Sequence, residues 1–360
     1  MPEPALHLTE LHALPPSLLT TPARLLHTVL PGPTLIHLPG RREPALFVCA
    51  LLHGNEDVGL AALQMVLRKH ARQPLPRALS LFIGNIEAAA EGLRRLDGQP
   101  DYNRAWPGTV AHVGTPEHGL MTRVHDIMRA RGVFASLDIH NNTGLNPHYS
   151  VVTDLTPQTL HLARLFSRTV VWFRGTPGTQ TGAFSSWCPS VAVECGQPGQ
   201  ATNEMAAARF IEAALHLSDF PDHPLPASEL DLYHALAVVK VAPELSFGFG
   251  DPDAALRFDA EMDHRNFVEL PAGAVFAHST HPRPLQAWDE QGQDVAEALF
   301  ERVGDALQLA RPAMPAMITR DLRVVRQDCL CYLMERVPRS LVGTAMVDGT
   351  SQFERRGGGV

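Results

Sequence analysis

The chain has few cysteines and no long apolar run. Its 360 residues include five cysteines, an odd number without regular spacing, which does not fit a disulfide framework. Cys329 and Cys331 are two residues apart and lack the spacing of a zinc ribbon. We therefore expect a reducing compartment. No stretch approaches the roughly 18 apolar residues of a membrane-spanning helix, and no glycine-rich phosphate loop or internal repeat is visible.

An excess of positive charge is also missing. The formal net charge is −8, which argues against nonspecific binding of nucleic acid. The first residues, Met1-Pro2-Glu3-Pro4, contain no basic segment followed by an apolar run, so we expect no secretory signal. These features predict a cytoplasmic protein without nucleic-acid or membrane partners, and they leave homo-oligomerisation open.

The order of apolar patterns predicts an α/β fold. Between residue 45 and about residue 215, short apolar strands alternate with helical patterns, as in a sheet covered by helices. An opening strand or hairpin is expected near 34–38. Strands are expected at 44–52, 134–140 and 189–194, and helices at 57–69, 117–131, 156–166 and 203–217.

A proline-rich segment, 217–226, predicts a linker, after which the pattern changes to β. We expect an α/β domain over residues 1–220, a β-rich domain over 227–340 and a flexible tail over 341–360. Expected elements of the second part are strands at 235–241, 321–325 and 330–334, a strand-turn-strand unit at 267–276, and a helix or insertion at 294–309.

Two strand ends carry side chains that suit a catalytic metal. His53-Gly54-Asn55-Glu56 follows the apolar run 44–52 and offers an imidazole and a carboxylate, a pair that binds zinc. Alone, this four-residue pattern is weak. His140 ends the next apolar segment, and Asp138, two residues earlier, could orient its ring. His53, Glu56 and His140 would leave one position for water, as catalytic zinc sites do.

A further strand end supplies a candidate base. Glu194 ends the apolar strand 189–194, and a buried carboxylate needs a partner or a role. It is either a paired or solvent-facing residue or a general base beside a metal-bound water. Between these strands, Asn103-Arg104 lies in a shaped loop, Asp101-Tyr102-Asn103-Arg104, where the guanidinium could bind a carboxylate.

Along the chain the four motifs follow one another at 53–56, 101–104, 138–143 and 193–196. In this order they resemble the succinylglutamate desuccinylase and aspartoacylase family, a branch of the zinc carboxypeptidase clan. The resemblance implies a zinc-carboxypeptidase-like mixed sheet flanked by helices, with a C-terminal β-rich domain that narrows access to the site. It also implies one zinc ion per chain, held by His53, Glu56 and His140, and a water activated by Glu194.

The resemblance further implies that Asn103 and Arg104 hold a carboxylate of a small-molecule substrate. An arginine shortly before this pair would polarise the scissile carbonyl, and Arg95 matches better than Arg94. Tyr233 or Tyr332 could add a hydrogen bond to the reacting group, although a place in a β core is the alternative for each.

The sequence departs from the family about ten residues before Glu194. Aspartoacylases carry an arginine there that grips the amino-acid carboxylate, whereas this chain has none in 180–187, and the nearest is Arg174. The departure puts N-acetylaspartate in doubt as the substrate. Gln180, Phe184 and Trp187 hint at a different or less acidic group.

The predicted activity is zinc-dependent hydrolysis of an amide bond in a small N-acyl amino acid. One alternative is a metallocarboxypeptidase that acts on a peptide or a cell-wall fragment through the same residues. The other is a non-catalytic binding protein on the same fold.

Overall fold

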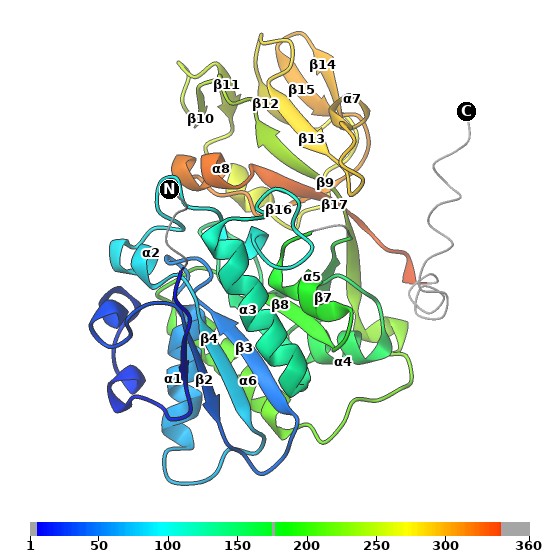
Figure 1. The fold of residues 1–360 in the computed structure, drawn as a ribbon. Helices are drawn as coiled ribbons and strands as arrows, with labels where there is room; N and C mark the ends of the chain where they lie inside the picture. The colour runs from blue at the N-terminus through cyan, green and yellow to red at the C-terminus, as the bar shows by residue number, and fades with distance from the viewer. Residues whose placement is uncertain (1–5, 175–176, 340–360) are drawn as a thin grey trace.

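A mixed β-sheet runs through the computed structural model, which describes residues 6–174 and 177–339 (Figure 1). Within those residues the sheet has twelve strands, and β13 pairs with β9 off its main path. In spatial order the strands are β1 (Thr9–Leu11), β2 (Thr34–Leu38), β4 (Leu79–Ile83), β3 (Ala45–Ala50), β5 (Val133–His140), β8 (Ser190–Glu194), β6 (Tyr149–Val152), β7 (Thr169–Trp172), β9 (Asp231–Val241), β17 (Cys331–Arg336) and β16 (Met314–Ala316), with β13 at Leu285–Trp288.

The central strands β4, β3, β5 and β8 are parallel to one another. Every residue of β3 is buried, because helices cover both faces of the sheet there and an apolar run suits a strand buried on both sides. Strands β3, β5 and β8 all end at one edge of the sheet. Polar residues that follow these strands are therefore brought together, and the next strand, β6, runs antiparallel to β8.

Two apolar layers hold the helices against this sheet. Helices α1 (Val58–Lys69), α4 (Pro157–Phe166) and α6 (Ala201–His216) share one hydrophobic cluster on one face. On the other face, α3 (Pro116–Arg131) and α5 (Gln180–Ser185) pack in a separate cluster with the opposite side chains of β3. Short helices complete this part: α2 (Ile86–Glu91), η1 (Pro16–Leu19), η2 (Ala23–Thr28), η3 (Tyr102–Arg104) and η4 (Ala227–Glu229).

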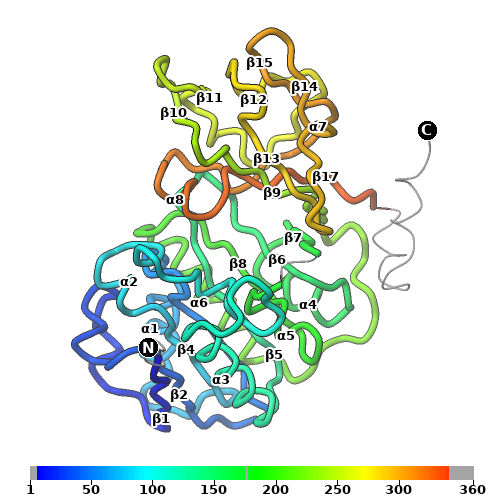
Figure 2. The backbone as a smooth tube through the Cα atoms, turned by 45° about the horizontal axis from the view of Figure 1, so that its top comes forward, coloured from blue at the N-terminus to red at the C-terminus, as the bar shows by residue number. Residues whose placement is uncertain are grey.

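The C-terminal part is β-rich and contains a second, five-stranded sheet at the top of Figures 1 and 2. Its own apolar cluster also includes residues of β9, β13 and β17, so the two sheets share a core where they meet. The strands and helices of this part are β10 (Phe247–Phe249), β11 (Leu256–Phe258), β12 (Val275–His278), β15 (Ala306–Leu309), β14 (Phe300–Val303), η5 (Met262–Arg265), α7 (Ala296–Leu299) and α8 (Leu322–Gln327).

The predicted fold class is confirmed, and the predicted helices of the first part match α1, α3, α4 and α6 closely. The predicted boundary between 220 and 227 stays a prediction. Strands β9, β13, β16 and β17 lie beyond it and still belong to the large sheet. The predicted tail, 341–360, lies outside the described residues.

Two predictions for the C-terminal part are wrong, and a third, a helix or an insertion at 294–309, is met only by the single turn of α7. The segment 321–325 begins a helix, because the Asp321 side chain accepts hydrogen bonds from the backbone N–H groups of Arg323 and Val324. Segment 294–309 holds one helical turn, followed by the hairpin of β14 and β15. In 267–276 only the second strand forms, since Phe267 has a φ of 60°.

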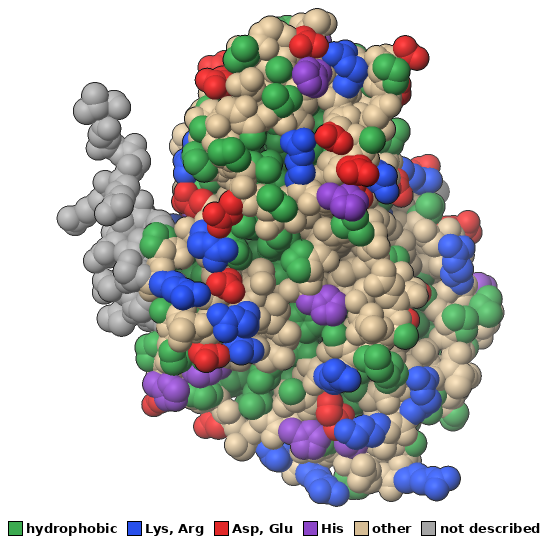
Figure 3. Space-filling view, turned by 180° about the vertical axis from the view of Figure 1, so that it is seen from behind, with side chains coloured by type: hydrophobic (Ala, Val, Ile, Leu, Met, Phe, Trp, Pro, Cys, Tyr) green, Lys and Arg blue, Asp and Glu red, His purple; other side chains and the backbone are tan. Residues whose placement is uncertain are grey.

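The surface carries charged side chains of both signs (Figure 3). On the face shown in Figure 3, acidic and basic side chains are interspersed rather than gathered by sign. Among the described residues, no helix combines the length and apolar character needed to cross a membrane. All five cysteines are buried and unbridged.

Candidate active site

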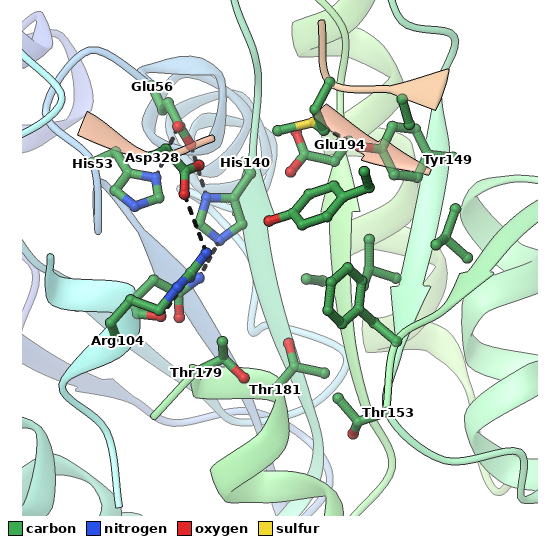
Figure 4. A pocket seen from close by; sticks show the side chains of 18 of the residues that line it. His53, Glu56, Arg104, His140, Tyr149, Thr153, Thr179, Thr181, Glu194 and Asp328 are labelled. Atoms are coloured by element: carbon green, nitrogen blue, oxygen red, sulfur yellow. Dashed lines mark hydrogen bonds and ion pairs between the residues drawn. The ribbon is translucent and has the colours of Figure 1, made fainter. Parts of the chain in front are cut away.

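Three side chains from two strand ends converge at the edge of the sheet. Glu56 is the centre: its Oε1 lies 2.8 Å from His53 Nδ1, and its Oε2 lies 2.7 Å from His140 Nδ1. One donor atom from each residue lies within 4.8 Å of the others, and all three residues are buried. Figure 4 shows the two imidazoles on either side of the carboxylate.

The chain turns sharply between β3 and His53. Leu51 has a φ of 56°, which is uncommon for a side chain of its size and marks a constrained turn. Gly54 is needed because of close packing rather than backbone conformation. A Cβ on Gly54 would lie 2.2 Å from the backbone nitrogen of Ala89, so only glycine allows this loop to pack against α2.

Each imidazole also faces a carboxylate with its second nitrogen. His140 Nε2 lies 2.7 Å from Asp138 Oδ2, the residue predicted to orient it. His53 Nε2 lies 3.0 Å from Asp101 Oδ1. Each Nδ1 lies at hydrogen-bond distance from the Glu56 carboxylate and donates to it; with a metal bound between them, Nε2 would keep its proton on the aspartate and Nδ1 would present its lone pair to the ion. This is the tautomer that a metal-binding histidine requires.

Asn103 lines the pocket, but its amide is engaged by the protein. Its Nδ2 donates to Asp138 Oδ2 at 3.0 Å, and its Oδ1 accepts from the backbone N–H of Gln180 at 2.8 Å. The side chain thus fixes Asp138 and, through it, the ring of His140. Its predicted contact with a substrate stays a prediction.

Arg94, and not the preferred Arg95, lies in the pocket, while the role predicted for this arginine stays a prediction. Arg94 is buried in the site and donates to Glu56 at 3.2 Å and to Asp101 at 3.1 Å. Arg95 donates to the backbone oxygen of Gln99 at 2.6 Å and does not line the pocket. The packing of the loop before Asp101 places Arg94 inside the site and Arg95 outside it. The spacing of residues in the sequence does not reveal this difference.

Asp328, which follows α8, contacts Arg94 and Arg104 from the C-terminal part. Its carboxylate lies 3.1 Å from Arg94 Nη2 and 3.5 Å from Arg104 Nη2. Burial opposes ionisation, but Arg94 and Arg104 outweigh it and hold the pKa of Asp328 below its usual range. Arg104 keeps its side chain 32% exposed, so it still faces the pocket.

Glu194 lines the pocket beside the three convergent side chains. It is the register partner of His140 in the pairing of β5 with β8, and Asn142 Nδ2 donates to its Oε2 at 3.2 Å. Burial raises the pKa of Glu194 to about 7; the neighbouring His140 partly offsets this effect and the Glu56 carboxylate adds to it. Such a carboxyl group exchanges a proton readily near neutral pH.

The pocket contains about 780 Å3 of space free of protein atoms, including its open mouth. Tyr149 and Thr153 lie on the far side from His53 in Figure 4, and Thr179 and Thr181 lie below. The C-terminal part contributes Ala316, Met317, Asp328, Tyr332 and Met334 to the lining.

Residues 42–220 match the model of the succinylglutamate desuccinylase/aspartoacylase catalytic domain. Over this region, the chain belongs to that family. The fold is similar to succinylglutamate desuccinylase from Vibrio parahaemolyticus, with a TM-score of 0.57, 12% identity, and coverage of 84% of this chain and 86% of that chain. It is also similar to murine aminoacylase 3, with a TM-score of 0.53, 17% identity, and coverage of 82% and 97%. No curated protein matches the chain by sequence.

The donor set of this family member suits zinc. Two imidazole nitrogens and a carboxylate oxygen are ligands that zinc accepts, and three protein ligands leave a position open for chemistry. Burial opposes ionisation of Glu56, yet His53 and His140 outweigh it and hold the pKa of Glu56 well below its usual range. With Asp101, Asp138 and Asp328 nearby and only two arginines to balance them, a divalent cation would offset the surplus negative charge.

Several residues that sequence reasoning named lie elsewhere. Gln180 points its side chain at Ser136, and Phe184 and Trp187 pack with His125 of α3. Two others lie away from the pocket: Arg174 pairs with Glu290 at 3.4 Å, and Tyr233 accepts a hydrogen bond from Arg336.

Sequence reasoning missed Asp101, Tyr149 and Asp328. Asp101 opened a motif that was noticed for its Asn-Arg pair, so a signal for it existed. Tyr149 starts β6 beside Glu194 in the pairing of β6 with β8. Asp328 approaches from a helix 224 residues beyond Arg104, and no local pattern marks it.

Proposed function

We propose that this protein is a zinc-dependent hydrolase that cleaves an amide bond in a small N-acyl amino acid. The observation that carries the proposal is the convergence of His53, Glu56 and His140, with Glu194 on the adjacent strand end of the same pocket. The family match supports hydrolysis as the reaction class.

His53, Glu56 and His140 would hold the metal, and Asp101 and Asp138 would keep both imidazoles in the required tautomer. A bound zinc ion supplies a Lewis acid and lowers the pKa of a water molecule. Every other contribution comes from side chains of the protein.

Glu194 is placed to take a proton from the attacking water and to deliver it to the leaving amine, for which a pKa of about 7 is suitable. Arg94 is the better candidate to stabilise negative charge on the scissile carbonyl, because it lines the pocket and Arg95 does not. Arg104, half-exposed to the pocket, would position the substrate carboxylate.

The C-terminal part favours a small substrate over a peptide. Met317, Tyr332 and Met334 of the C-terminal part line the pocket that also contains the candidate metal ligands, so they limit the space beside those ligands. This placement supports the deacylase over the carboxypeptidase.

The test is turnover of N-acyl amino acids by the zinc-loaded protein and by Glu194→Gln. The variant should lose at least about 10³-fold in kcat while keeping one zinc ion per chain, because the base is lost and the ligands remain. Glu212→Gln on α6, which removes a carboxylate paired with Lys69 away from the pocket, is the matched control and should keep full activity. Near-native turnover by Glu194→Gln contradicts the proposal.

A further inference from the structure

The wall of the pocket that faces away from the candidate metal ligands is apolar. Val151 and Tyr149 come from β6, Val171 and Phe173 from β7 and the residue after it, and Met334 from β17. All five belong to one hydrophobic cluster, of which this wall is the surface left open to the pocket. The wall is thus built on strands of the large sheet, which fixes its shape.

The arginines of the pocket, Arg94 and Arg104, lie on the opposite side, and both already contact carboxylates of the protein, Arg94 more closely than Arg104. Arg94 contacts carboxylates of Glu56, Asp101 and Asp328. Arg104 contacts Asp328 only at 3.5 Å and is partly exposed, so it retains capacity for one further carboxylate. Among the described residues that line the pocket, the apolar wall has no Lys, Arg or His. The polar groups at or beside it are the hydroxyls of Thr153, Thr179, Thr181 and Tyr332, and the OH of Tyr149, which donates to the Met317 sulfur.

A second substrate carboxylate would therefore meet this wall without a counter-charge. Removing a carboxylate from water without an ionic partner is unfavourable, whereas an aliphatic or aromatic group gains by leaving water there. Arg174, the closest arginine in sequence to the position that aspartoacylases use, pairs with Glu290 and does not line the pocket. The wall thus selects by charge as well as by shape.

We propose that the substrate is a monocarboxylate amide whose apolar group lies on the wall formed by Val151, Val171, Phe173 and Met334, and that N-acylated dicarboxylic amino acids are excluded. This proposal rests on the proposed function and names its substrate class. Arg104 takes the single carboxylate, and the wall takes the apolar group, on either the amino-acid side or the acyl side of the scissile bond.

The first experiment compares kcat/KM of the zinc-loaded protein for four compounds. N-acetyl-leucine and N-hexanoylglycine place the apolar group on either side of the amide, and N-acetylaspartate and N-succinylglutamate carry a second carboxylate. At least one apolar compound should exceed both acidic ones by about 100-fold. Equal or better use of an acidic compound overturns the proposal and leaves the hydrolase assignment intact.

A binding measurement separates the two assignments. Calorimetry gives the affinities of the four compounds for zinc-loaded Glu194→Gln. At least one apolar compound should bind more tightly than both acidic ones, even if the native protein hydrolyses none of the four. If the native protein hydrolyses none of the compounds but the variant binds an apolar one most tightly, the proposed function is refuted and the proposed ligand class is supported. Binding that favours the acidic compounds refutes the substrate class.

A charge introduced into the wall provides a gain-of-function test. Val151→Arg should shift the ratio of acidic to apolar kcat/KM by at least about 10-fold toward the acidic compounds, because it supplies the missing cation. Thr153→Arg places the cation at the same wall and replaces that variant if it does not fold. Val110→Arg, at a side chain 84% exposed and outside the pocket, is the control and should leave the ratio unchanged. An unchanged ratio in a folded wall variant contradicts the proposal.

Discussion

Asp138→Asn tests the support behind one candidate ligand. Asp138 is fully buried, and its Oδ2 lies 2.7 Å from His140 Nε2 and 3.0 Å from Asn103 Nδ2, both of which donate to it. Its Oδ1 is buried without a hydrogen-bond partner among the described residues. An asparagine therefore fits badly in either orientation. Its amide nitrogen either faces two donors or takes the place of Oδ1, a buried atom that has no hydrogen-bond partner in the native protein.

The loss of the negative charge weakens His140 as a ligand, and the misplaced amide tilts its ring. Loss of such an outer partner lowers metal affinity by about 10- to 100-fold, or about 1.4 to 2.7 kcal/mol. We expect the upper half of that range, because Asp138 also anchors Asn103.

The assay is competition for zinc between the apoprotein and a chromophoric chelator. Asp97→Asn, at an exposed aspartate paired with Arg323, is the control and should keep the native Kd. Thermal unfolding of each apoprotein shows whether the variant is folded at the assay temperature. A folded Asp138→Asn protein with a Kd within about threefold of the native value would refute this reasoning.

Three further predictions follow from the site. Burial raises the pKa of Glu194 to about 7, and this group must be ionised to accept a proton, so kcat/KM should rise with pH and then level off. The midpoint should lie at or below about 7, because a bound cation favours the carboxylate. A rise of kcat/KM only above pH 8 would argue against Glu194 as the base. Arg94→Lys should lower kcat/KM by about 10²-fold, whereas Arg95→Lys should stay near native, and steady-state kinetics of the pair decide between the two arginines. Gly54→Ala should lower the melting temperature and zinc content together, because the added methyl would lie 2.2 Å from the nitrogen of Ala89; a native melting curve would show that the loop can move aside.

The parts of the site that the sequence predicted depend on local patterns. A strand that ends in a polar turn was visible for His53, His140 and Glu194, and parallel neighbours bring such ends together without further information. The four long helices of the first part were visible for the same reason, since each carries its own apolar periodicity.

The parts that the sequence did not predict depend on packing between distant segments. The choice of Arg94 over Arg95 is set by how the loop folds against Asp101 and Asp328, and neither contact is encoded by spacing. The start of helix α8 was predicted as a strand from its apolar residues, whereas the N-cap at Asp321 is the feature that marks a helix there. The domain boundaries stay predictions, and the oligomeric state stays open.

Titration of zinc into the metal-free protein, with turnover of an N-acyl amino acid recorded at each addition, tests the central claim most directly. The account predicts that activity rises in proportion to added zinc and stops rising at one ion per chain, and that His140→Ala neither binds the ion nor gains activity. A protein that takes up no zinc, or whose activity does not depend on it, would contradict the account and favour a binding protein on this fold.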